Sequence, residues 1–169
     1  AFYDQRIQFA KADKEQEERK REELVKYYIQ SYIEIKNKIN YVGLVGQQAI
    51  DKFYKNVKIS VRNAADTSMG EKLNFIKAVN GSDFTKGGHL SLYYRSLKSI
   101  ANTLSKYNLT NIIPMWEHSM SEEEKALVYY LLKYYGNQKT EIEYLLKHKF
   151  LDSLQGNVLI NEEDTLKRS

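Results

Sequence analysis

Pro114 is the only proline among the 169 residues, and only eight glycines accompany it. With so few residues that interrupt a helix, the chain favours long helices over the short strands and tight turns of an all-β protein. Hydrophobic residues make up 42% of the sequence and charged residues 28%, which is the balance of an ordinary folded domain. Cysteine is absent, so disulfide and thiolate chemistry are excluded. We therefore expect an all-α fold, a bundle of about five to six helices.

The N-terminal part of the chain predicts a long charged helix. Between Lys11 and Glu23 apolar residues are almost absent, and acidic residues precede basic ones at the i, i+4 spacing that stabilises exposed helices. Phe2 and Phe9 share a heptad phase, but Gln16 and Glu23 follow in that phase, so a coiled-coil seam through the two phenylalanines fails. A helix that bridges solvent is the better interpretation. Beyond this stretch the pattern becomes apolar at helical spacing, so the second half of the helix should dock on the core.

Apolar residues at helical spacing predict the remaining helices and the domain limits. We expect helices at residues 4–40, 47–65, 71–79, 89–107, 121–135 and from 140 to about 155, with an irregular connector at 108–119 and a polar loop at 80–88. The predicted organisation is a charged helical stalk or linker at 1–23, an all-α domain at 24–156 and a C-terminal tail at 157–169. Within the tail, Val158–Ile160 should make a short apolar contact.

Three local signals predict where two of these helices begin and end. Ser121 with Glu124, and Thr140 with Glu143, have the Ser/Thr-x-x-Glu spacing of a capping box at a helix N-terminus. Gly136 follows an apolar run, in the position where a left-handed glycine commonly ends a helix.

The positive charge of the chain is concentrated in its middle. Residues 52–106 contain ten basic and three acidic side chains, an excess of seven, whereas the whole chain has a net charge of +4. One helix face in this segment carries a row of basic residues, namely Lys52, Lys55, Lys58 and Arg62. This pattern permits binding to the phosphates of nucleic acid, although such a bias is also typical of a solvated helix face.

No catalytic or metal-binding motif is recognisable in the sequence. The histidines, His89, His118 and His148, lie in different segments without the close ligand pairs of zinc sites. All-helical ribonucleases carry an Arg followed five to seven positions later by His, whereas here His89 precedes Arg95. We expect no catalytic residue, no metal and no cofactor, and the sequence favours a protein that is not an enzyme.

The segment Gly88–Ile100 reads Gly-His-Leu-Ser-Leu-Tyr-Tyr-Arg-Ser-Leu-Lys-Ser-Ile and resembles the central signature of the phage abortive infection (AbiC-like) family. The family's second motif is matched by Tyr94, Arg95, Leu97, Lys98 and Ile100. Its later helix, which starts Ser-x-x-Glu and continues Leu-x-x-Tyr, is matched by Ser121, Glu124, Leu127 and Tyr130.

This resemblance implies an antiphage defence module, a sensor or effector that works by contact with a phage or host protein. Family members often carry N-terminal transmembrane segments, which implies the cytoplasmic side of a protein anchored to the inner membrane by an upstream segment. The candidate binding surface is the polar side of the helix at 89–107, with Arg95, Lys98, Asn102 and the neighbouring Tyr94. Arg95 is the most informative member, because a guanidinium can bind a carboxylate or phosphate through two hydrogen bonds.

Two alternatives remain open. The basic segment 52–106 could belong to an effector that binds nucleic acid or cleaves RNA. The chain could also be a helical scaffold that forms homo-oligomers through its tyrosine-rich faces.

Overall fold

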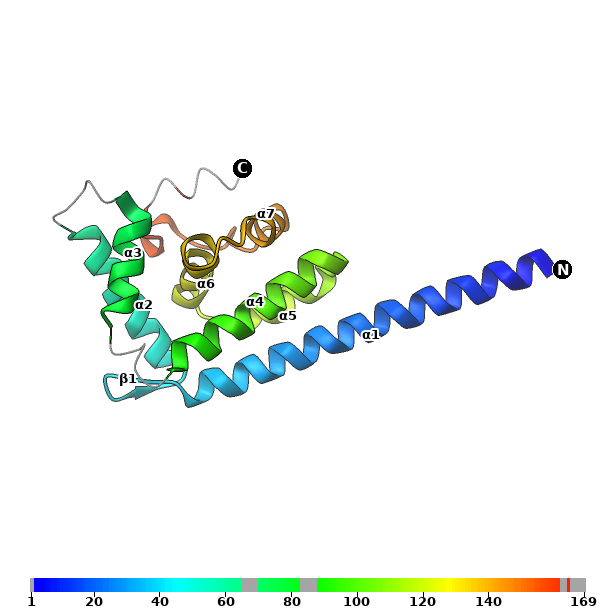
Figure 1. Ribbon diagram of the computed structural model, residues 1–169, viewed down its shortest axis with the longest axis horizontal. Helices are drawn as coiled ribbons and strands as arrows, with labels where there is room; N and C mark the ends of the chain where they lie inside the picture. Colours follow the sequence, from blue (N-terminus) through cyan, green and yellow to red (C-terminus); the bar gives the residue numbers. More distant parts are fainter. Residues whose placement is uncertain (1, 65–69, 83–87, 162–163, 165–169) are drawn as a thin grey trace.

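The first helix, α1 (Phe2–Lys38), dominates the computed structural model shown in Figure 1, which describes residues 2–64, 70–82, 88–161 and 164. Its N-terminal half projects beyond the rest of the molecule as a single helical rod (Figure 1). Every side chain from residue 2 to residue 20 is exposed, and the first buried one is Val25. The prediction of a long charged helix that docks through its second half is confirmed.

A short antiparallel hairpin links α1 to α2, and the sequence did not predict it. Strand β1 (Asn40–Tyr41) pairs with β2 (Leu44–Val45). The two residues between the strands, Val42 at φ 48° and Gly43 at φ 81°, both have positive φ, as in the type I′ turns that join paired strands. Gly46, at φ 64°, then turns the chain into α2. The gap expected between the helices at 4–40 and 47–65 is therefore an ordered turn.

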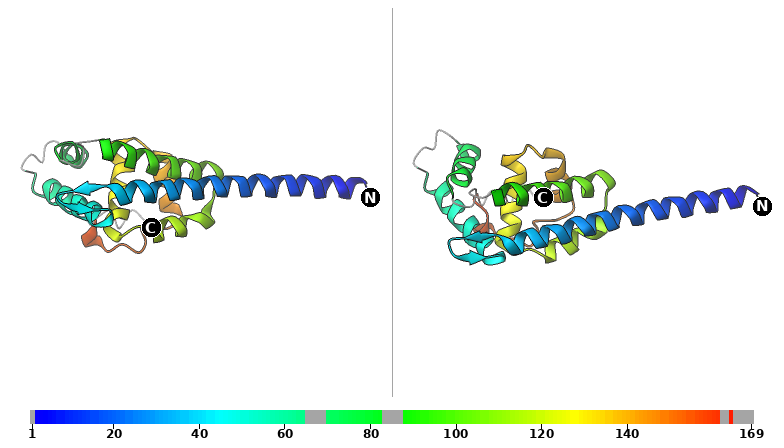
Figure 2. Two further views of the ribbon diagram at one scale, coloured as in Figure 1. Left: turned by 90° about the horizontal axis from the view of Figure 1, so that it is seen from below. Right: turned by 60° about the horizontal axis from the view of Figure 1, so that its bottom comes forward.

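Helices α2 (Gln47–Arg62) and α3 (Gly70–Asn80) lie together at the end of the molecule opposite the N-terminus (Figure 1). Helix α4 (His89–Tyr107) has the predicted bounds and runs alongside the second half of α1, as both views of Figure 2 show. All three were expected from their apolar faces. The predicted polar loop at 80–88 falls mostly outside the described residues.

The predicted connector at 108–119 is helical, so that expectation was wrong. It contains a 3-10 turn at Thr110–Ile112 and the short helix α5 (Ile113–His118). Pro114 is compatible with α5 because it lies in the first turn, where a backbone N–H has no helical acceptor. Trp116 is fully buried, with its ring centroid 5.4 Å from that of Phe150, and this packing holds α5 on the core.

Helix α6 (Glu122–Tyr130) continues through a π-helical turn, Leu131–Tyr135. A π turn holds an extra residue and so re-aims the side chains that follow. Here the hydroxyl of Tyr134 donates to Glu71 at 2.6 Å and that of Tyr135 to Asn80 at 2.7 Å, both on α3. The predicted end of the helix at Tyr135 and Gly136 is confirmed, but Gly136 is not left-handed, since its φ is −136° and the positive φ belongs to Asn137.

The last helix, α7 (Lys139–Lys147), is shorter than predicted. It begins one residue before Thr140, with no side-chain cap, and Glu143 pairs with Lys139 at 3.9 Å, so the second capping box was wrong. Lys149 has a positive φ of 63°, which ends the helix well before Gly156. Gly156 instead opens a 3-10 turn that runs to Val158.

Residues 157–161 and Asp164 still belong to the folded domain. Leu159 and Ile160 are buried, which confirms the apolar contact predicted there. Asp164 is only 3% exposed and accepts a hydrogen bond of 2.8 Å from the hydroxyl of Tyr130 on α6. The predicted boundary at 156 therefore lies inside the packed structure, while most of the tail beyond residue 161 falls outside the described residues.

Candidate functional site

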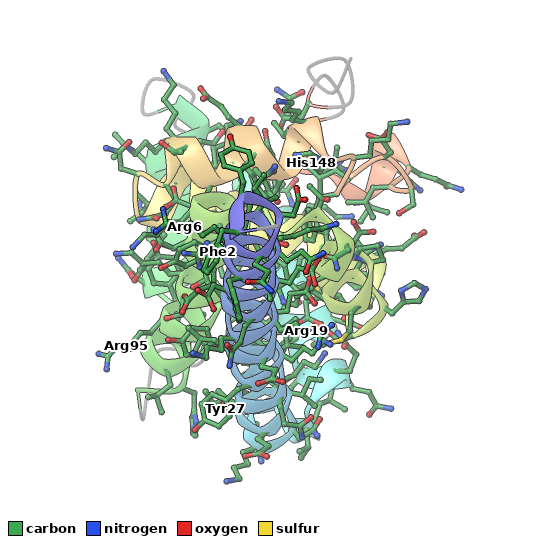
Figure 3. The ribbon with its side chains drawn as sticks, turned by 90° about the vertical axis from the view of Figure 1, so that its right-hand side faces the viewer. Phe2, Arg6, Arg19, Tyr27, Arg95 and His148 are labelled. Atoms are coloured by element: carbon green, nitrogen blue, oxygen red, sulfur yellow. The ribbon has the colours of Figure 1, made fainter. Side chains whose placement is uncertain are left out.

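Helix α4 places three of the four predicted contact residues on the molecular surface. Arg95, Lys98 and Asn102 are exposed, and Figure 3 shows Arg95 pointing away from the body of the protein. Within the described part of the chain, the Arg95 guanidinium forms no ion pair. It is therefore available to an acidic group from outside the molecule.

Arg95 also borders a shallow apolar groove between α1 and α4. Tyr28 and Ile35 line the groove from α1, and Leu92 lines it from α4 together with the aliphatic part of Arg95. Leu92 is 51% exposed, a large value for a leucine beside a helix–helix contact. The groove thus offers apolar surface directly beside a positive charge.

Tyr94 and Asn102 also make contacts within the fold. Tyr94 is half-buried, with its ring centroid 5.6 Å from that of Tyr135, and its buried hydroxyl has no hydrogen-bond partner in the described structure. Burial raises the pKa of Tyr94 above its usual value. Asn102 donates a hydrogen bond of 3.1 Å to the buried carboxylate of Glu141, which fastens α4 to α7. Arg95, Lys98 and Asn102 therefore share the exposed side of α4, whereas Tyr94 packs inward against Tyr135.

Most of the predicted basic face of α2 is engaged within the molecule. Lys55 pairs with Glu123 at 3.4 Å, Lys58 donates to a backbone carbonyl at residue 157, and Arg62 donates to the carbonyl of Leu159 at 2.6 Å. Burial, together with the nearby Arg62, lowers the pKa of Lys58. Of the four residues, Lys52 alone has no such contact among the described residues. These contacts attach the C-terminal segment to α2 and leave little free charge for phosphates.

A buried ion pair, which the sequence did not predict, lies where α1 meets α6. Glu124 is fully buried and Lys36 is 4% exposed, with 3.1 Å between Lys36 Nζ and Glu124 Oε2. The Lys36 ammonium also donates to Gln47 Oε1 at 3.0 Å and to the carbonyl oxygen of Ser119. Three acceptors therefore match the three protons of the ammonium group.

The second oxygen of Glu124 accepts hydrogen bonds from two tyrosines, Tyr32 on α1 and Tyr93 on α4, the latter at 2.8 Å. Ser121 Oγ accepts from the backbone N–H of Glu124 at 3.1 Å, as a capping residue should. The Glu124 carboxylate, however, turns into the core instead of reaching back to Ser121. The hydrogen bond from the Glu124 N–H to Ser121 Oγ, one half of the predicted capping box, is confirmed. The other half, in which the Glu124 carboxylate accepts from the N–H of Ser121, was wrong.

Helix α2 joins this network through Gln47 and Asp51. Gln47 Nε2 donates to Asp51 Oδ1 at 2.9 Å and to Ser121 Oγ at 3.0 Å, and the Ser121 hydroxyl donates to Asp51 at 2.6 Å. Burial lowers the pKa of Lys36 from 10.5 to about 8 and raises the pKa of Glu124 well above its usual range. The network connects α1, α2, α4 and α6, so its chemical role is to fix the relative positions of these helices.

A metal site and a membrane-spanning helix are two further features that could indicate a function. Within the described parts of the chain, no three His, Cys, Asp or Glu side chains are close enough together to hold a metal ion. The helices of these parts also include none that combines the length and the apolar character needed to cross a membrane. No protein-family model, curated protein or solved structure matches the chain. The interpretation of function therefore depends on the exposed part of α4 and on the resemblance of the α4 and α6 sequences to the signature of the abortive infection family.

Proposed function

We propose that this chain is an antiphage defence module of the abortive infection type, which acts by binding a phage or host protein. The observation that carries the proposal is the position of Arg95, exposed and without an internal ion pair, beside an apolar groove. A partner that presents a carboxylate next to an apolar side chain would match this surface, because a guanidinium binds a carboxylate through two hydrogen bonds.

The residues that resemble the family signature fall into two groups. Most of them are internal: Leu97, Ile100, Leu127 and Tyr130 are buried, and Ser121 and Glu124 belong to the polar network. Arg95 and Lys98 are the members that face solvent. The internal group preserves the fold, which leaves the exposed pair as the part of the signature that can contact another molecule.

We further propose that the protein works on the cytoplasmic side of the inner membrane, held there by a segment ahead of α1. The exposed half of α1, with its balanced acidic and basic side chains, suits a spacer between such a segment and the domain.

A phage plating assay tests the proposal. Bacteria that express the gene should give fewer plaques than cells without it, and Arg95→Ala should restore plating toward the unprotected level. Arg19→Ala is the matched control, because Arg19 is another exposed arginine that points away from Arg95 (Figure 3), and it should keep full protection.

Two results would contradict the proposal in different ways. If the wild-type gene protects against none of a broad panel of phages, the defence function is wrong. If protection is present but Arg95→Ala protects as well as Arg19→Ala, the contact surface lies elsewhere.

A further inference from the structure

The projecting half of α1 carries large apolar side chains that nothing in the described structure covers. Phe2, Tyr3, Ile7 and Phe9 are 84%, 77%, 53% and 70% exposed. A helix that only bridges solvent needs no such residues, and exposed apolar clusters commonly mark a contact with another molecule. The question is which molecule.

A heptad seam runs along nearly the whole of α1. It begins at Tyr3, one residue after Phe2, and so differs in phase from Phe2 and Phe9. Its members alternate in steps of four and three residues: Tyr3, Ile7, Ala10, Lys14, Glu17, Arg21, Leu24, Tyr28, Ser31 and Ile35. Such spacing over more than four heptads is the pattern by which two helices pack along each other. Phe2 and Phe9 do not belong to it.

Along the seam, apolar residues gather toward both ends and opposite charges meet at the centre, while Lys14 lies opposite Leu24 in an antiparallel pair. Both ends are mainly apolar, with Tyr3 and Ile7 at one end and Tyr28 and Ile35 at the other, and the centre is charged. A second copy running in the opposite direction would place Tyr3 against Ile35, and Glu17 against Arg21, at both symmetry-related positions. A parallel copy would place like charges against each other at the centre, which is unfavourable.

The domain already provides the surface for the apolar end of a second copy. Tyr28 and Ile35 are only partly buried and line the groove between α1 and α4, where the exposed Leu92 lies opposite them. In the antiparallel register, Tyr3 and Ile7 of the second copy meet this groove. Figure 3 looks along α1 from its N-terminal end and shows Arg95, which borders this groove, beside α1 on the outside of the molecule.

We propose that α1 pairs in antiparallel orientation with α1 of a second copy of this chain, each free tip filling the groove of the other copy. The overlap from residue 3 to residue 35 is about 50 Å long at the rise of an α-helix. Arg95 and Lys98, on the outer side of α4, then stand at the rim of the dimer interface. The dimer goes beyond the proposed function. It fills the groove beside Arg95, so in the dimer a protein partner would meet the exposed Arg95 and Lys98 at the rim and not the groove itself. The two N-termini lie at opposite ends of the paired helices, so the spacer role proposed for α1 belongs to the single chain.

The molecular mass in solution tests the dimer, measured by sedimentation or light scattering. The wild-type chain should give twice its mass of 19.8 kDa. Tyr3→Lys with Ile7→Lys should weaken the dimer roughly a hundredfold or more, because four apolar contacts are lost from each pair of chains. Phe2→Lys with Phe9→Lys is the matched control, equally exposed but outside the seam, and should remain dimeric. The fold of the domain does not depend on any of the four, since they contact none of it.

Charge reversal tests the register. Glu17→Arg alone should weaken the dimer about tenfold by creating two like-charge contacts with Arg21, and adding Arg21→Glu in the same chain should restore it. Arg21 also stacks on the Tyr107 ring of its own chain at 4.4 Å, so the single change is made at Glu17. Because the chain has no cysteine, orientation can be tested by mixing Lys14→Cys with Leu24→Cys, which should form a disulfide between the two different chains. A monomer at high concentration overturns the proposal. So does a dimer that survives Tyr3→Lys with Ile7→Lys, or one in which residues 14 of two chains cross-link.

Discussion

Lys36→Met is expected to lower the free energy of unfolding by about 3–5 kcal/mol at neutral pH, because it leaves the carboxylate of Glu124 buried without a cation. Glu124 is fully buried, and two tyrosine hydroxyls fix its side chain in place, so it cannot move to solvent without breaking further hydrogen bonds. Urea unfolding followed by circular dichroism measures the change. Lys38→Met, an exposed lysine two residues further along α1, is the control and should change stability by less than about 0.5 kcal/mol.

A second substitution separates the loss of the ion pair from the loss of packing. Glu124→Gln removes the charge but keeps an oxygen that can accept from Tyr32 and Tyr93. In the double variant with Lys36→Met, no unpaired charge remains, and most of the lost stability should return. If the double variant is as unstable as Lys36→Met, the cost comes from the lysine side chain's packing and not from the unpaired carboxylate.

The Lys36→Met variant should also respond to pH in an unusual direction. Burial raises the pKa of Glu124 in the folded protein above its value in the unfolded chain. The folded state then binds the proton more tightly, so its stability is greatest below the unfolded pKa and falls as the pH rises through the folded pKa. The urea midpoint should fall as the pH rises above the pKa of an ordinary glutamate, about 4.3, and the double variant should lack this fall. A midpoint independent of pH would show that Glu124 is not the titrating group.

Local patterns predicted the helices well and the connections poorly. The apolar stripe of α4 gave its observed bounds, because a face that packs on a core repeats at the helical period over the whole element. The hairpin after α1 and the end of α7 depend on positive φ at Val42 and Lys149, two residue types that rarely adopt it. Tertiary packing imposes those conformations, so the sequence carries no local sign of them.

The polar network could be predicted only in part. Lys36 follows Ile29 and Tyr32 on the buried face of α1, and a lysine on such a face indicates a buried acidic partner. Its partner, Glu124, lies 88 positions further along the chain, and nothing local identifies it. The capping-box pattern at Ser121 in fact assigned Glu124 a different role, at the helix terminus. A pairing of this kind becomes visible only once α1 and α6 are packed together.

The seam on α1 shows how one conspicuous pair of residues can hide another pattern. Phe2 and Phe9 draw attention to a heptad phase that fails at Gln16. The phase that begins at Tyr3 has a charged centre and so looks interrupted when it is read for a parallel pair. In an antiparallel pair the same phase places Glu17 of one copy opposite Arg21 of the other. The groove beside Ile35 in the structure would receive the apolar end of the second copy.

Gly136→Ala is expected to destabilise the protein by about 1–3 kcal/mol, the usual cost of forcing an extra carbon into a packed site. A methyl group at this position would overlap the hydroxyl of Tyr94 and approach its Cζ to 2.7 Å. The backbone of Gly136, at φ −136°, is open to any residue, so conformational strain does not contribute. Glycine is required here because the Tyr94 ring lies directly against the end of the π turn. Thermal or urea unfolding measures the loss.

A double-mutant cycle with Tyr94→Leu tests this cause, because leucine is shorter and does not reach Gly136. In the Tyr94→Leu background, Gly136→Ala should cost less than half of what it costs in the wild type, which corresponds to a coupling energy of about 1 kcal/mol between neighbouring sites. Equal costs in both backgrounds would show that the glycine serves the backbone of the π turn. Because Tyr94 also precedes Arg95 on α4, loss of this contact would loosen the helix that presents the proposed binding surface.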